Sequence, residues 1–196
     1  MKALVLAFAL LSSAAPTPAA PEGQPELAAL KKKLASVVSL SASFTQTRHW
    51  SALKDAMVTQ GTFSWSRGGK LVWRTRPPAE SELIVEGKQA TMRYPALGTS
   101  QSFDFSAQPG MAAVFDSIAA VLQADFDRLA PLYEISVVKA SPPRVSLKPR
   151  SAEMAKVISG IELAFNAKLD LETVVMLEGG GDKTEISFSN QVSSGK

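Results

Sequence analysis

Short stretches with apolar side chains at every second position run through much of the chain and constrain its fold more than any other feature. Three such stretches lie within residues 62–86 and contribute six large side chains: Phe63, Trp65, Leu71, Trp73, Leu83 and Val85. This alternation is typical of antiparallel strands that have one buried and one solvated face. The glycine-containing segments 67–69 and 86–88 follow the first and the third stretch and predict tight turns.

Other segments have the longer period of an α-helix. Apolar residues recur at helical spacing from Leu27 to Val37 or Val38, beside a solvated face of lysines. A second stripe, within residues 111–122, includes Met111, Phe115 and Ile118. Residues 151–158 predict one more helical turn.

Strand-like runs return in the second half of the chain, at 133–138, 145–148, 161–165, 169–177 and 184–189. The sequence contains no internal repeat and no βα alternation. Many antiparallel strands with two or three helices predict an α+β domain, in which a curved antiparallel sheet carries the helices on its concave face.

The first 19 residues have the layout of a secretory signal peptide. A short basic start precedes an apolar run at 3–11, and a small-x-small cleavage site follows at 17–19. The apolar run is too short to span a bilayer, and no later stretch approaches about twenty apolar residues. We therefore expect a soluble protein that is exported to the periplasm or secreted, with residues 20–24 as a flexible leader.

The chain contains no cysteine and a single histidine, His49. These counts exclude disulfides, iron–sulfur clusters and a lipid anchor on an N-terminal cysteine, and they leave too few ligands for a typical zinc site. The 21 Lys and Arg are balanced by 18 Asp and Glu, with no basic block that would favour nucleic acid. We expect a monomer without metal, cofactor or nucleic-acid partner.

Three short motifs invite a catalytic interpretation, and each lacks a necessary partner. Ser51 and Lys54 form a Ser-x-x-Lys motif, but the other motifs of serine penicillin-recognising enzymes are absent. Residues 179–184 look like a phosphate-binding loop that Asp182 interrupts, and a β-turn between two strands is the simpler interpretation. His49 could belong to a catalytic triad, but the sequence has no Gly-x-Ser-x-Gly elbow that would present the serine nucleophile. An exported serine hydrolase that uses Ser51 and Lys54 remains the alternative from the enzyme class.

The apolar residues support two interpretations that periodicity cannot separate. In the first, the six strand side chains and the helical stripe with Met111, Phe115 and Ile118 form an ordinary filled core. In the second, they line a hollow between sheet and helices that accepts acyl chains, because large aromatic and adaptable methionine side chains suit such a cavity.

Several segments, spread over nearly the whole mature chain, also follow a family pattern. They are Phe44-Thr45-Gln46, Gln60-Gly61-Thr62-Phe63, Arg67, Leu71-Val72-Trp73, Pro78, 80–88 and 181–190. In these segments the chain resembles the periplasmic outer-membrane lipoprotein carrier family, LolA. The resemblance implies an incomplete, strongly curved β-barrel with helices as a lid over a hydrophobic cavity, in a domain at 25–190 that a flexible tail at 191–196 follows.

The resemblance further implies a non-enzymatic role. Members of the family receive an acylated lipoprotein from an inner-membrane transporter and pass it to an outer-membrane acceptor. The residues expected to contact the lipid are Phe63, Trp65, Leu71, Trp73, Leu83, Val85, Met111, Phe115 and Ile118. Arg67 matches in position the arginine that holds the family's lid closed through main-chain carbonyls of the helices. A solvated turn residue is the other interpretation of Arg67.

Two departures from the family pattern concern the cargo. Gly68 and Gly69 follow Arg67 where the family usually has proline, and residues 89–94 replace an aromatic-rich strand. The sequence therefore leaves two kinds of cargo open, an acylated lipoprotein or a non-lipoprotein glycolipid or polyene-type lipid.

Overall fold

The computed structural model describes residues 24–104, 120 and 125–195. The strands within these residues are β1 (Val37–His49), β2 (Met57–Ser66), β3 (Lys70–Thr75), β4 (Ser81–Glu86), β5 (Gln89–Tyr94), β6 (Thr99–Asp104), β7 (Tyr133–Lys139), β8 (Arg144–Pro149), β9 (Ile158–Phe165), β10 (Leu171–Glu178) and β11 (Lys183–Gly195). The helices are α1 (Gln24–Ala35), the 3₁₀ turn η1 (Pro95–Leu97), α3 (Phe126–Leu129) and α4 (Ala152–Val157).

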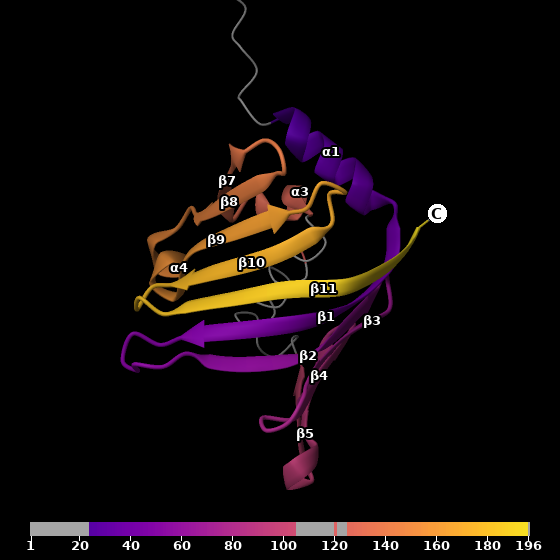
Figure 1. Cartoon of the computed structure of the whole chain (residues 1–196), viewed down its shortest axis with the longest axis vertical. Coiled ribbons are helices and arrows are strands. Elements are labelled where there is room, and N and C mark those ends of the chain that lie inside the picture. Colours follow the sequence, from indigo (N-terminus) through magenta and orange to yellow (C-terminus); the bar gives the residue numbers. More distant parts are fainter. Residues whose placement is uncertain (1–23, 105–119, 121–124, 196) are drawn as a thin grey trace, which may run out of the picture.

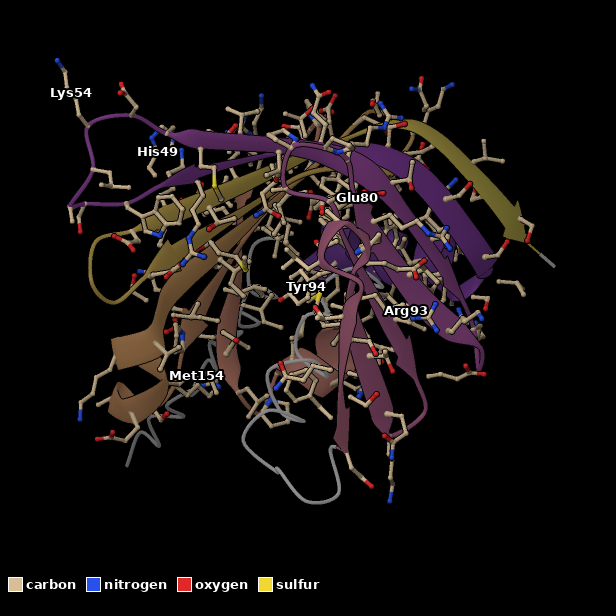
Figure 2. The ribbon with its side chains drawn as sticks, turned by 90° about the horizontal axis from the view of Figure 1, so that it is seen from below. His49, Lys54, Glu80, Arg93, Tyr94 and Met154 are labelled. Carbon is tan, nitrogen blue, oxygen red and sulfur yellow. The ribbon has the colours of Figure 1, made fainter. Side chains whose placement is uncertain are left out.

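All of these strands belong to one antiparallel sheet, in the order β6-β5-β4-β3-β2-β1-β11-β10-β9-β8-β7 (Figure 1). The outer strands β6 and β7 do not pair with each other, so the sheet stays open. Seen from below, the sheet forms an arch whose two arms descend from the central strands (Figure 2). The fold is the expected one, an α+β domain with a strongly curved sheet that forms an incomplete barrel.

Strand register confirms that the predicted apolar residues of β2, β3 and β4 share one face of the sheet. Phe63 lies opposite Trp73, and Trp73 lies opposite Leu83, across β2, β3 and β4. Directly opposed residues of antiparallel strands share one face of the sheet. The two predicted glycine turns are present, one between β2 and β3 and one between β4 and β5, and Gly68 and Gly87 adopt the positive φ values of 69° and 58° that glycine tolerates without strain.

The hydrophobic core lies on the concave side of the sheet. It joins inner residues of β1, β2 and β7–β11 to apolar side chains of the helices. Leu30 of α1 and Leu129 of α3 are fully buried, and Met154 of α4 packs against the same cluster. Helix α1 contacts both β1 and β7, so it bridges strands from the centre and the edge of the sheet. No helix among the described residues has the length and apolar content that crossing a membrane requires.

The first helix ends earlier than predicted and the last strand ends later, and both differences follow from the early start of β1. The helix stops at Ala35, and Val37 and Val38 begin β1, because these two adjacent β-branched residues favour a strand and precede a run in which serines alternate with apolar residues. The early start of β1 gives the chain end a partner: Val37 lies opposite Gly195. The expected flexible tail at 191–196 is therefore wrong through Gly195, since these residues extend β11. The predicted helix at 111–122 lies outside the described residues, apart from the helical and buried Ala120.

Gly61 allows a close approach on the concave face. It lies opposite Phe44, and a Cβ on Gly61 would overlap Arg74 O and lie 2.6 Å from the Phe44 ring. We expect Gly61→Val to displace that ring and to lower the free energy of unfolding by about 1–3 kcal/mol, measured by urea denaturation. Gly180→Val is the matched control, since nothing lies within 4 Å of its added Cβ. Equal effects of both substitutions would contradict the close packing at Gly61.

Candidate functional site

The inner face of β2–β4 carries the predicted lipid-contacting residues. Register places Trp65 opposite Leu71, and Leu71 opposite Val85, in a row parallel to the one formed by Phe63, Trp73 and Leu83. The structure thus brings together six of the nine predicted residues on three adjacent strands. The other three, Met111, Phe115 and Ile118, lie outside the described residues.

The two arms of the sheet differ in how completely their inner faces are buried. On the β8–β9 arm, Val145, Leu147 and Leu163 are 0% exposed. On the β2–β4 arm, five of the predicted side chains are half-buried: Trp65, Leu71, Trp73, Leu83 and Val85. One arm is therefore a dry core, whereas the other presents apolar surface that water or a ligand reaches.

Four aromatic rings fill the centre of the arch. Phe44 stacks on Trp73 with ring centroids 4.0 Å apart, and Phe63 meets Trp73 edge-on at 5.7 Å. Phe188 of β11 lies 6.0 Å from Phe63 and 6.3 Å from Trp73. The centre is thus a packed cluster in which Phe63 is only 2% exposed. The candidate lipid surface begins beside this cluster, on the half-buried residues of β3 and β4.

Arg67 binds the end of α1. Its Nη2 donates to the carbonyl oxygens of Leu34 (3.2 Å), Ala35 (3.2 Å) and Val37 (2.9 Å), and its Nε also donates to Val37 O. The last carbonyls of a helix lack partners within the helix, so a guanidinium can satisfy several of them at once. The contact with helix carbonyls that the resemblance implies is present, and a role in closing a lid remains a prediction.

Two concave features flank α1. Beneath its C-terminal end lies a cavity of about 30 Å³ beside Trp65 and Leu171, with room for roughly one water. A larger groove, of about 440 Å³, runs between α1, α3 and β7. The predictions from sequence did not include this groove, because its lining residues come from distant segments that share no local pattern.

Ser51 is bound in a way that explains its position without catalysis. Its main-chain N–H and its hydroxyl both donate to Asp182 Oδ1, at 2.8 and 2.9 Å. These bonds tie the β1–β2 loop to the β10–β11 turn, and they lower the pKa of Asp182 because they favour its charged form. Residues 179–182 form that turn between two strands, as predicted. Lys54 is not a hydrogen-bond partner of Ser51 within the described residues.

The described part of the chain holds no group of three or more His, Asp or Glu side chains placed to bind a metal ion. His49 is exposed at the end of β1, opposite Lys183. The side chains that gather on the concave face are apolar and aromatic, and covering such a surface with an apolar group removes it from water.

Comparison with known proteins gives a family match over residues 35–196, to the family described as "Outer membrane lipoprotein carrier protein LolA". The chain is 29% identical over 168 residues to the outer-membrane lipoprotein carrier protein of Bordetella avium (strain 197N), covering 82% of this chain and 74% of that protein. It is 23% identical over 167 residues to the protein of the same name from Pseudomonas fluorescens (strain Pf0-1), covering 84% and 76%. Among solved structures, a LolA superfamily protein from Nitrosomonas europaea matches with a TM-score of 0.41 and 7% identity, over 84% of this chain and 92% of that one.

The pKa of Asp182 predicts how the link between the two loops responds to acid. Since this pKa is lowered in the folded protein, the ionised carboxylate contributes stability above its ordinary value of 3.8. That contribution disappears as the pH falls through the lower folded pKa. We expect Asp182→Asn to reduce the melting temperature at neutral pH and the difference from the parent protein to shrink in acid, measured by circular dichroism. Asp55→Asn, in the β1–β2 loop to which Asp182 binds, is the control. A difference that persists unchanged in strong acid would argue against the ionised carboxylate.

Proposed function

Because the chain belongs to the LolA family of outer membrane lipoprotein carrier proteins, we propose that it is a periplasmic carrier that binds the acyl chains of a lipid-bearing cargo. The acyl chains lie on the half-buried inner face of β2–β4. The cargo is an acylated lipoprotein, which an inner-membrane transporter supplies and an outer-membrane acceptor receives. No chemical step is part of the proposed function.

The half-buried row of apolar residues on β3 and β4 is the observation that supports the proposal most. Leu71, Leu83 and Val85 are only partly covered, although they lie on the core side of the sheet. Covering such residues with an acyl chain removes apolar surface of both partners from water, which yields roughly 0.8 kcal/mol per buried methylene. The free energy of binding then depends on chain length, whatever polar group the cargo carries.

Arg67 opposes cargo binding in this proposal, because it stabilises the position of α1 without cargo. Its bonds to Leu34 O, Ala35 O and Val37 O stabilise α1 in the position that the structure describes. A hydrogen bond from a charged donor contributes roughly 1.5–3 kcal/mol at most, and less here because water competes at an exposed guanidinium. We propose that a cargo which displaces α1 loses this contribution. Binding thereby stays reversible, and transfer to an acceptor needs no energy source.

The chain-length dependence tests the acyl-binding face. We expect delipidated protein to bind a fluorescent fatty-acyl probe, with affinity that rises with each methylene until the face is filled. Leu83→Asn should weaken binding of a long chain by about tenfold, since it places an amide on the apolar face. Ile84→Asn is the matched control, because the neighbouring residue of the same strand points to the opposite face. Affinity without chain-length dependence, or equal loss in both variants, would contradict the proposed function.

Arg67→Leu tests whether Arg67 opposes cargo binding by holding α1 in its closed position. The variant should fold, since the strands and the core cluster do not include the Arg67 side chain. It should retain a bound acyl probe longer than the parent protein when acceptor vesicles are added, because α1 is held less firmly in its closed position. Arg76→Leu serves as the control, for an exposed arginine in the next hairpin connection. Transfer at the parent rate in Arg67→Leu would leave Arg67 as a turn residue.

A further inference from the structure

We propose that the groove between α1, α3 and β7 is a second binding site, which takes an amphiphile with a negatively charged carboxylate or phosphate head. The groove is separate from the acyl-binding face proposed above, because β7 lies at one edge of the sheet and β2–β4 belong to the other arm. This inference therefore does not depend on acyl chains binding to β2–β4.

The groove has the size and lining of a small-ligand site. Its volume of about 440 Å³ falls within the range of 300–1,000 Å³ that is usual for such sites. Its apolar wall consists of Leu27 and Ala28 from α1, Phe126 from α3, and Tyr133 and Ile135 from β7. Charged groups occur at Lys31, Asp127 and Arg150. An apolar wall with few charges matches a ligand that has an apolar chain and one polar end.

Arg150 is the group that favours an anion. Its Nε donates to Ala130 O at 3.0 Å and to Tyr133 O at 3.2 Å, and its main-chain N–H donates to Leu132 O. These bonds fix the plane of the guanidinium beside the groove. Its two Nη nitrogens donate to no residue in the described ranges. A rigid fork of unused donors is suited to the two oxygens of a carboxylate or phosphate.

Lys31 adds a second cation whose present partner is easily replaced. Its Nζ lies 2.6 Å from Asp127 Oδ1, across the groove from α1 to α3. The two side chains are 43% and 81% exposed, and an ion pair this exposed contributes little to stability. A bound oxyanion can therefore take the place of Asp127 beside Lys31. With two cations and one carboxylate, the three charged groups carry a net charge of +1, which favours a singly charged anion over a neutral or cationic head.

A series of ligands with one chain and different heads tests the charge class by isothermal titration calorimetry. The probes are dodecanoate, dodecyl phosphate, dodecyl maltoside and dodecyltrimethylammonium, with inorganic phosphate as the probe without a chain. We expect each anionic amphiphile to bind at two sites in the concentration range where dodecyl maltoside binds at one. At the second site, the anionic amphiphiles should bind roughly tenfold more tightly than dodecyl maltoside. Inorganic phosphate that bound as tightly as dodecyl phosphate would overturn the proposal of an amphiphile. Tighter binding of the cationic probe would overturn the charge assignment.

Three variants locate the site. Arg150→Gln and Lys31→Gln should each remove most of the preference for anionic heads and leave the affinity for dodecyl maltoside unchanged. Asp127→Asn should raise the affinity for dodecanoate several-fold, since it removes the competing carboxylate, and a purely structural role of Asp127 predicts no such gain. Arg144→Gln is the control. Arg144 is exposed, and it lies on the opposite face of β8 from its buried neighbour Val145.

The variants also separate this inference from the proposed function. Arg150→Gln can weaken the fold, since it loses two bonds to main-chain carbonyls, so Lys31→Gln provides the independent measurement. An unchanged preference for anionic heads in both variants would overturn the inference and leave acyl binding on β2–β4 intact. Conversely, Leu83→Asn should reduce the affinity for dodecyl maltoside and keep the anion-specific site. If none of the amphiphiles binds, both proposals are wrong.

Discussion

The pairing of β1 with β11 is the interaction on which the rest of the structure depends. It joins an arm built from residues 57–104 to an arm built from residues 133–178, and no other ladder of the described sheet connects the two. Its partners are far apart in the chain, from Val37 opposite Gly195 to His49 opposite Lys183. Closing so long a loop costs chain entropy before any contact offsets it. The sheet is therefore complete only after β11 has paired with β1.

The aromatic cluster explains how the joined arms keep different interiors. Phe44 of β1 and Phe188 of β11 face each other directly at the joint, and Trp73 packs against both rings. This cluster separates the fully buried side chains of β8 and β9 from the half-buried row on β3 and β4. The inner face of the sheet is thus divided into a fully buried part and a part that stays partly exposed.

Local patterns in the sequence predicted what depends on neighbours along the chain and missed what depends on distant partners. The alternation at 62–86 and the glycine turns were sufficient to place Phe63, Trp73 and Leu83 on one face, because pleating alone fixes that geometry. The strand at 191–195 was missed, since most of its residues are polar or glycine and only the early start of β1 makes them a strand. The groove was missed for the same reason: Lys31 and Arg150 lie on elements that only the folded topology brings together. The bonds from Arg67 to α1 were expected from family resemblance and not from any pattern in the turn itself.

The register of the central ladder also determines how the protein responds to mechanical force. Val37 and Gly195 form the outermost pair of the β1–β11 ladder, so the two strands leave it at the same end. Tension applied between these residues loads the hydrogen bonds one pair at a time, as in a zipper, and not all together in shear. The ladder that completes the sheet is therefore also its point of least resistance to pulling, and under tension the arms would part along β1 and β11 before either arm lost its own strand pairs.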